Sequence, residues 1–476
     1  MTIRATGRRL LASVGLRSGS VPLTTDLLQY DVRRPSRHPV DLVVGFDFGT
    51  SCTKVVIQSP TKLRGRAVAV DFEELGHFSS HRLLPTVITE ASSGEVHLGA
   101  GTDRPGQVRN DLKIRLLEQE VPASPEELEG YTARAAAHVG LALRRARQWF
   151  LTAEQRNYGT DRFRWAMNFG VPSAGFDDDE IRERFHRVAR AGWALSLTPE
   201  HVTLKRAIAS VRAADRGSKS KVDATIEVVP EVAAQVVGYA KSRQRRDGLH
   251  LLVDIGASTI DVCAFLLHGV DGDDVYELLS AEVKQLGLLA LHAARMRAAP
   301  SVSDLQTVPG DLVVPIPDWT GKVKLSPEVR EQLERADAAY VGGCSRQVLY
   351  KVMNHVRKRR DPHSPHWETG LPIFVCGGGS ADRVAPVIVR QAEAAAKKNW
   401  VKCKGFEPNL LPVPASLAGG IEADSFRQRL SVAYGLSFDS FNIGTIQSPR
   451  EIEDVPPDGI HRLGDWKDRF VGMDQV

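Results

Sequence analysis

Two apolar runs, one in each half of the chain, end at an acid and a glycine and then resume. The first is VDLVVGFDFGT from Val40, and the apolar stretch TKVVIQ follows it, which predicts a β-hairpin. The second is LHLLVDIGASTIDVCAFLL from Leu249, which predicts a strand, a turn and a strand. Nearly continuous apolar strands of this kind are typical of a buried sheet.

Further strands are predicted around and after the first hairpin. RAVAVDF predicts a third strand, and PTVITEASSGEVHLGAG predicts another hairpin that turns at Ser93 and Gly94. RFRWAMNFGVP predicts a strand, and ATIEVVPEVAAQVVGYAKS predicts a strand that passes into a helix.

Several helices begin at recognisable caps. Ser124, Pro125 and Glu127 form a capping box with proline at the first helical position, and apolar residues at helical spacing continue towards Trp149. The acids at 177–179 favour the start of a second helix through its dipole. Helices are also predicted in SPEVREQLERADAAYVGG, after the glycines of LPIFVCGGGSADRVAPVIVRQAEAAAKK, and in RQRLSVAYGLSF, which is expected to be the last.

Strand-rich hairpins alternate with helices in both halves, which predicts two α/β lobes of similar plan rather than a barrel or a sandwich. We expect a basic extension over 1–39, lobe I over 40–245, lobe II over 246–438 and a tail over 439–476. The polar stretch KSRQRRDG is expected to join the lobes, and the last helix is expected to return to lobe I.

The two ends of the chain differ from the lobes in composition. The first forty residues are rich in arginine and poor in acids, which favours a basic extension over an organellar transit peptide. The tail from Asp439 carries Pro449, Pro456 and Pro457 among mixed charges. We expect it to be extended and to lie on the lobes or on a partner.

Composition narrows the class of protein. A chain of 476 residues suits two or three packed lobes, and a net charge of +4 is too small to indicate a nucleic-acid-binding surface. Five scattered cysteines without a CxxC pair indicate neither a disulfide framework nor a zinc site, and they favour a reducing, cytoplasmic location. No segment approaches the roughly 18 uninterrupted apolar residues of a membrane span.

The turn DFGTSCTK places a carboxylate, Asp47, at the end of an apolar strand, and Gly49 lets the backbone approach a ligand. It offers the hydroxyls of Thr50, Ser51 and Thr53. Such a turn can wrap phosphate oxygens while the carboxylate holds a hydrated magnesium ion. Taken alone, it is matched equally well by an ordinary polar hairpin turn.

The turn DIGASTID from Asp254 repeats this plan after the second apolar run, as D-x-G-x-x-T-x-D. Its further members are Gly256, Ala257, Ser258, Thr259 and Asp261. A carboxylate at the end of an apolar strand is costly unless it is satisfied, which favours an ion beside Asp47 and Asp254. A third element, VCGGGSADR, places glycines between a strand and a helix, where backbone N–H groups suit a nucleotide; its residues are Gly377, Gly378, Gly379 and Ser380.

These three elements, in this order, resemble the superfamily of actin, the heat shock protein 70 chaperones and the sugar kinases. DFGTSCTK resembles the first phosphate motif, DIGASTID the second, and CGGGS the adenosine motif. VPEVAAQVVGYA and RLSVAYGLSF resemble the two connecting helices. The resemblance covers roughly 40–437, is closest to the heat shock protein 70 ATPase domain, and implies duplicated ribonuclease H-like lobes with a nucleotide cleft.

The resemblance implies roles for individual residues. Asp47 and Asp254 match the acids that hold magnesium through water, and Asp261 matches the second acid of its motif. Glu231 matches a glutamate that positions water, and Lys113 resembles a lysine that contacts the phosphates. Thr50 and Thr259 match hydroxyls near the terminal phosphate, Gly377 to Ser380 match the adenosine loop, and Ala257 and Ser258 replace glycines usual in the chaperones. For Lys113, an ordinary surface lysine is an equal alternative.

The implied cofactors are ATP or ADP with Mg²⁺, and the implied reaction is slow hydrolysis of ATP by a conformational switch that acts on a partner protein. A switch that only binds ATP would keep most of these residues. The chaperones continue into a peptide-binding domain, and no such domain is apparent in the remaining tail. An actin-like filament former is the first alternative, and a small-molecule kinase ranks below it.

Other residues have simpler interpretations. Cys52 is expected to be a buried, unreactive thiol, and Trp165 and Trp193 are expected to be core. The basic run at 357–360, with two nearby histidines, lacks interleaved aromatic residues and is expected to be a solvated helix end rather than a nucleic-acid or lipid contact.

Overall fold

The computed structural model describes residues 39–75, 81–100, 106–117, 124–158, 161–215, 224–300, 325–400, 402–409, 411–412, 416–418 and 429–456. The described chain divides into two compact units. Unit 1 contains the described residues up to Tyr239 and those from Pro412 to Ile443, and unit 2 contains the rest. The expected basic extension and most of the expected tail lie outside the described residues.

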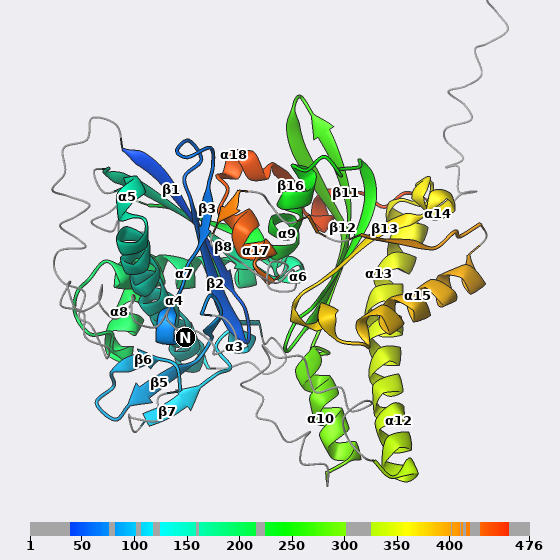
Figure 1. Ribbon diagram of the computed structural model, residues 1–476, viewed down its shortest axis with the longest axis horizontal. Helices are drawn as coiled ribbons and strands as arrows, with labels where there is room; N and C mark the ends of the chain where they lie inside the picture. The colour runs from blue at the N-terminus through cyan, green and yellow to red at the C-terminus, as the bar shows by residue number, and fades with distance from the viewer. Residues whose placement is uncertain are drawn as a thin grey trace, which may run out of the picture. The chain divides into compact units, whose positions relative to one another are not determined.

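Unit 1 is built on a mixed sheet in the order β15-β3-β2-β1-β8-β9, with β4 paired to β2. Figure 1 shows β3, β2, β1 and β8 of this sheet. The antiparallel strands β1, β2 and β3 are followed by β8 and β9, which run parallel to β1. The strands are β1 Val40–Phe48, β2 Cys52–Gln58, β3 Ala67–Ala69, β4 Leu84–Pro85, β8 Phe163–Val171, β9 Thr225–Pro230 and β15 Leu417–Ala418.

Helices cover both faces of this sheet. On one face the side chains of Leu42, Val44 and Phe46 share a core with three long helices, and on the other Val56 packs with the last helix of the unit. The first group is α4 Pro125–Ala153, α7 Asp179–Ser196 and α8 Leu204–Asp215. The second face carries α17 Ser431–Leu436, which α9 Glu231–Ala240 crosses (Figure 1).

A smaller antiparallel sheet, in the order β6-β5-β7, contacts α4. It comprises β5 Ile88–Ala91, β6 Val96–Leu98 and β7 Gly106–Arg109. β5 and β6 form the second predicted hairpin, which is thereby confirmed. The short helices in the described part of unit 1 are α3 Ile114–Leu117, α5 Gln155–Tyr158, α6 Ser173–Phe176 and α18 Ser440–Ile443.

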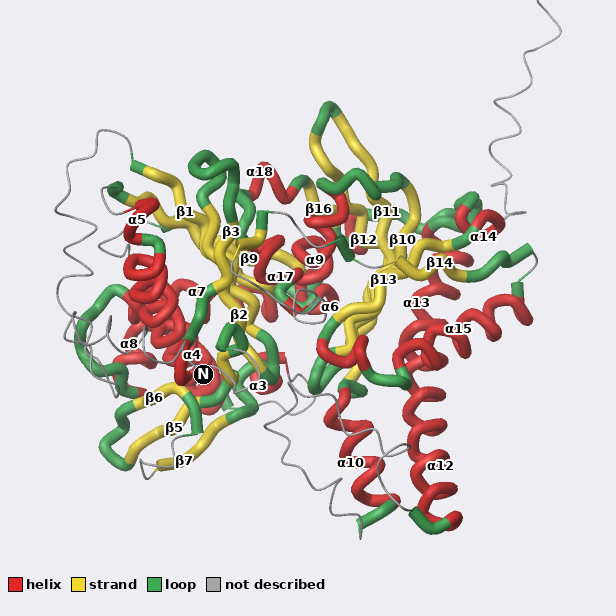
Figure 2. Tube along the Cα trace, in the orientation of Figure 1, coloured by secondary structure: helices red, strands yellow, loops and turns green. Residues whose placement is uncertain are grey.

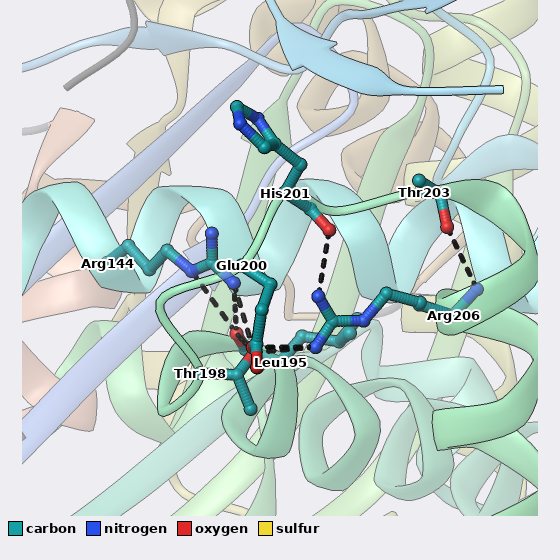
Figure 3. A network of polar contacts seen from close by, with 7 residues as sticks. All are labelled: Arg144, Leu195, Thr198, Glu200, His201, Thr203 and Arg206. Carbon is teal, nitrogen blue, oxygen red and sulfur yellow. Dashed lines mark hydrogen bonds and ion pairs between the residues drawn. The ribbon is translucent and has the colours of Figure 1, made fainter. Parts of the chain in front are cut away.

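Two arginines tie the helices of unit 1 together (Figure 3). Arg144 of α4 donates hydrogen bonds to the carbonyl oxygen of Leu195 and to Thr198 Oγ1. Arg206 of α8 donates to Thr198 Oγ1 as well, and its ion pair with Glu200 spans 2.9 Å. Burial lowers the pKa of Arg144 to about 10, and the charge of Arg206 lowers it further.

Unit 2 is built on a sheet in the order β14-β13-β10-β11-β12-β16 (Figure 2). β10, β11 and β12 are antiparallel, while β13 and β14 run parallel to β10, which is the same plan as in unit 1. The strands are β10 Gly248–Ile255, β11 Ile260–Val270, β12 Asp273–Lys284, β13 Leu371–Cys376, β14 Phe406–Asn409 and β16 Thr445–Gln447.

A long helical segment and α15 contact each other in unit 2, and the long segment also contacts β11 and β12. The long segment runs through α12 Pro327–Gly343, a π-helical stretch Cys344–Leu349, α13 Tyr350–His355 and a second π-helical stretch Val356–Arg360. Among the described residues, the other helices of unit 2 are α10 Leu288–Ala298, α14 His366–Thr369 and α15 Ala385–Asn399, and the 3₁₀ segments are Glu73–Leu75, Gly378–Ala381 and Pro449–Glu451.

The predicted caps are confirmed. Ser124 accepts from the N–H of Glu127 and the Glu127 carboxylate accepts from the N–H of Ser124, which closes the capping box of α4. Asp178 caps α7 through two backbone N–H groups, and Ser326 caps α12. Trp165 and Trp193 are buried core residues, as predicted.

The prediction for the end of the chain is wrong in two respects. RQRLSVAYGLSF is not the last helix, because α18 follows it. The segment after Asp439 is not simply extended, because β16 pairs with β12 and a capping box joins Ser448 and Glu451. The edge strand β12 offers unpaired backbone groups, and β16 satisfies some of them.

Candidate functional site

The predicted acids of unit 1 lie where parallel strands end. Asp47 is the penultimate residue of β1, and Glu231 directly follows β9 as the first residue of α9. β1, β8 and β9 are parallel neighbours, so their carboxyl ends share one edge of the sheet. This edge is where ligands bind in open α/β sheets.

Asp47 is buried and forms an ion pair with Lys54. The Lys54 ammonium donates to Asp47 Oδ2 at 2.6 Å, and the two residues face each other across the hairpin. Only 4% of Asp47 is exposed, and a buried carboxylate that loses such a partner destabilises the protein unless another partner replaces it. Lys54 closes the motif DFGTSCTK and was not among the predicted site residues.

Lys113 and Glu231, which are 118 positions apart, form a second such pair. Lys113 Nζ donates to Glu231 Oε1 at 2.6 Å, and Lys113 is 6% exposed. The interpretation of Lys113 as an ordinary surface lysine is therefore wrong. Two of the residues implied by the resemblance are in direct contact.

The proposed ligand role of the Thr53 hydroxyl is wrong. Successive residues of a strand point to opposite faces, so Lys54 lies on the Asp47 face and Thr53 on the other. Thr53 is fully buried there, 2.9 Å from His138 Nε2 and 3.0 Å from Thr86 Oγ1.

The turn between β1 and β2 is held by Thr86, which sequence reasoning missed. The Thr86 hydroxyl donates to the carbonyl oxygen of Gly49 at 2.7 Å, and its backbone N–H donates to that of Ser51 at 2.8 Å. Thr50 and Ser51 are half-buried at the turn, and Cys52 is buried. Burial raises the pKa of the Cys52 thiol, in keeping with the prediction that it is unreactive.

In unit 2, Asp254 and Asp261 are opposite each other on neighbouring strands. They form a register pair in the β10–β11 hairpin, so their side chains lie on the same face at about 5 Å between Cβ atoms. The negative charges of both also raise the pKa of the Cys376 thiol, after the larger effect of burial. A cation is favoured beside two such carboxylates.

The turn at 256–259 is bound to the start of α10. The carbonyl oxygens of Gly256, Ala257 and Ser258 accept from the first N–H groups around that helix start, at 2.8–3.1 Å. A side chain at Gly287 would overlap the Ala257 carbonyl oxygen, so only glycine permits this approach. The helix and this glycine were missed, although the run LGLLALHAARMR is a possible signal.

The third predicted loop, at 377–380, lies directly against Asp254. Gly377 has a φ of +80°, and a side chain there would overlap the Asp254 carboxylate. Gly378 and Gly379 continue in a 3₁₀ turn, and the Ser380 hydroxyl donates to the Gly377 carbonyl at 2.8 Å. Thr259, at the end of the neighbouring turn, is half-buried.

A buried ion pair supports this part of unit 2. Arg295 of α10 binds Asp337 of α12 through two hydrogen bonds, at 2.6 and 2.9 Å. Arg383, just after the third loop, also pairs with Asp337. The bidentate pair is geometrically specific, so it fixes α10 against α12, while the single contact of Arg383 links the end of the third loop to the same carboxylate.

Each unit therefore brings together its own share of the predicted residues. In unit 1 they form two groups, the turn of Asp47, Gly49, Thr50 and Ser51, and the pair of Lys113 with Glu231, without the Thr53 hydroxyl. In unit 2 they are Asp254, Asp261, the turn at 256–259 and the loop at 377–380. The basic run at 357–360 belongs to neither set, because it ends the long helix of unit 2.

Comparisons with known proteins give no family: no family model matches the chain, and no curated protein matches it. Among the described residues, no helix is both long and apolar enough to cross a membrane. The same part of the chain holds no group of three or more histidine, cysteine, aspartate or glutamate side chains suited to binding a metal directly.

Proposed function

We propose that the protein binds ATP with magnesium and acts as a slowly hydrolysing conformational switch of the actin-like ATPase fold, closest to the heat shock protein 70 nucleotide-binding domain. One observation carries the proposal. An acid–glycine–hydroxyl turn joins the first two strands of the sheet in both units, and the strand order and directions around it are the same. We propose that turns of this kind bind the phosphates of ATP.

The donor set suits a hydrated magnesium ion. Magnesium keeps most of its water and needs only one or two carboxylates, and Asp47 and Asp254 would supply them. Bound magnesium would neutralise charge on the phosphates. The absence of a direct ligand cluster in the described residues is compatible with such binding through water.

The chain's own residues would bind and orient the reactants. Backbone N–H groups of the first turn and of the loop at 377–380 would contact the nucleotide, as such turns do for anions. Lys54 and Lys113 would compensate phosphate charge, and Glu231 or Asp254 would orient the attacking water. With no further cation assigned to the transferred phosphate, hydrolysis is expected to be slow.

A switch of this kind acts through another molecule, and we propose a protein partner that recognises the nucleotide state. ATP favours one conformation only by its higher affinity for it. An actin-like filament former is the alternative function, because the same fold supports assembly. A small-molecule kinase ranks below both, since it needs a base directed at a substrate hydroxyl.

The experiment that separates these functions is phosphate release from magnesium–ATP over a wide range of protein concentrations. A switch gives slow release proportional to protein concentration. Release that rises more steeply than the concentration would favour filaments. Bound ATP without release would leave a kinase that lacks its substrate or a sensor that only binds.

A further inference from the structure

A chain of buried hydrogen bonds runs from the core of unit 1 to the first turn. It begins at His138 on α4, passes through Thr53 on β2 and Thr86 after β4, and ends at the carbonyl oxygen of Gly49. The distances between the bonded atoms are 2.9, 3.0 and 2.7 Å, and all three side chains are fully buried.

Within this chain of three hydrogen bonds, the directions follow from counting the protons of its members. A carbonyl oxygen can only accept, so the Thr86 hydroxyl gives its proton to Gly49. Thr86 Oγ1 then accepts from Thr53, whose own oxygen must accept from His138 Nε2–H. The Nδ1–H tautomer would leave three hydrogen bonds to be made with two hydroxyl protons.

The imidazole is suited to this fixed role. Burial lowers the pKa of His138 to about 3, and a hydrogen bond between the ring and the Val87 backbone raises it by less, so the ring is neutral at pH 7. The His138 ring also packs beside that of Phe48, at 5.8 Å between centroids. Its orientation is thus set by the core and not by solvent.

We infer that His138, Thr53 and Thr86 are positioning residues that fix the backbone of the first phosphate turn for the nucleotide. The inference rests on the proposed function, since it assigns to these residues the geometry of the same turn. None of the three would touch ATP. They act through the Gly49 carbonyl, whose orientation sets that of the peptide N–H groups beside it.

The test compares hydrogen exchange of the peptide 49–53 and the Kd for magnesium–ATP in the full chain. Thr86→Val and Thr53→Val keep the shape and remove the hydroxyl, while Thr86→Ser and Thr53→Ser restore it. Thr89→Val is the matched control, because buried Thr89 donates to the Gly99 carbonyl at 2.7 Å, in the smaller sheet.

We expect the two valine variants at the turn to exchange its amides faster and to bind ATP roughly three- to tenfold more weakly, as for the loss of one or two hydrogen bonds. The serine variants should stay within about twofold of the wild type. Thr89→Val should change only stability. Exchange in Thr86→Val that matches Thr89→Val would overturn the inference.

A second measurement stands apart from ATP binding. The ¹⁵N spectrum of labelled His138 should show the Nε2–H tautomer, and the Nδ1–H tautomer would overturn the proton order. If the wild type binds no ATP, the proposed function fails, while the exchange comparison and the tautomer still decide whether the chain of hydrogen bonds fixes the turn.

Discussion

At the scale of single residues, each of the two predicted site acids of unit 1 forms an ion pair with a lysine. Asp47 pairs with Lys54 and Glu231 pairs with Lys113, with little exposure of either Asp47 or Lys113. A buried charge without a partner costs several kcal/mol, so each ion pair stabilises its carboxylate in the folded protein. In the proposed function, the lysines would turn to phosphate oxygens and release the acids.

Glu231→Gln tests the proposed role of Glu231 in orienting the attacking water. The amide keeps the size of the side chain and removes its charge, so we expect phosphate release to fall by about 10² while ATP affinity stays within about threefold. The control is Glu227→Gln, four residues earlier on β9. An equal fall in phosphate release in both variants, or no fall in Glu231→Gln, would contradict the role of Glu231 in orienting water.

His250 provides a pH-dependent prediction. Its ring lies between those of Phe265 and Phe374, its Nδ1–H donates to the Gly248 carbonyl, and burial lowers its pKa to about 4. Arg246 and His366 lower the pKa and Asp247 raises it, each by less than burial does. An ordinary histidine in the unfolded chain titrates near 6.5, so the unfolded state binds more protons between these values.

The free energy of unfolding is therefore expected to fall as the pH drops below about 6.5, by about 1.4 kcal/mol per pH unit for this one group. His250→Asn keeps the donor near the Nδ1 position and cannot titrate. Urea unfolding at pH 7.5 and pH 5 should show a loss about 2 kcal/mol smaller in the variant. Equal losses in both proteins would exclude His250 as a source of acid sensitivity.

At the scale of elements, the strand–turn–strand plan could be predicted because it is local. An apolar run that stops at Asp47 or Asp254 indicates a buried strand and its turn without further information. Successive residues of a strand point to opposite faces, so Thr53 and Lys54 cannot both face the Asp47 side of the sheet. The motif alone does not include this alternation, which is why the prediction for the Thr53 hydroxyl failed. Thr86 and the pairing of Lys113 with Glu231 could not be predicted, because they depend on contacts far apart in the sequence.

The crossing of α9 and α17 gives a prediction at this scale. A side chain at Gly435 would overlap the Ala234 carbonyl oxygen, so Gly435→Ala must push the helices apart. We expect a loss of about 2–3 kcal/mol in the free energy of unfolding, as for an overpacked core. Gly130→Ala, in α4, meets only the flexible end of Arg134 and is the matched control.

In Gly130→Ala, the higher helix propensity of alanine should raise the free energy of unfolding by up to about 1 kcal/mol. Urea unfolding of both variants measures the difference. If Gly435→Ala is as stable as Gly130→Ala, the close crossing of the two helices is not a property of the molecule in solution.

At the scale of the whole molecule, the chain consists of two units with the same arrangement of five strands around the same kind of turn. The prediction of two α/β lobes of similar plan was possible because each half repeats the pattern. The short elements near the end of the described chain, α18 and β16, show only a weak sequence pattern for a helix or a strand. Their formation depends on the elements that they pack against, such as the edge of β12 for β16. The sequence alone therefore predicted the repeated α/β arrangement of the two units better than it predicted the elements near the end of the chain.

The most direct test of the central claim is a calorimetric titration of ATP into the full chain, with magnesium and with chelator. We expect saturable binding that needs magnesium, and we expect Asp47→Ala to abolish it. Asp41→Ala is the matched control, because Asp41 lies on the same strand and the same face, in an exposed pair with Arg164. Binding in Asp47→Ala that equals the wild type, or no binding in the wild type, would contradict the account.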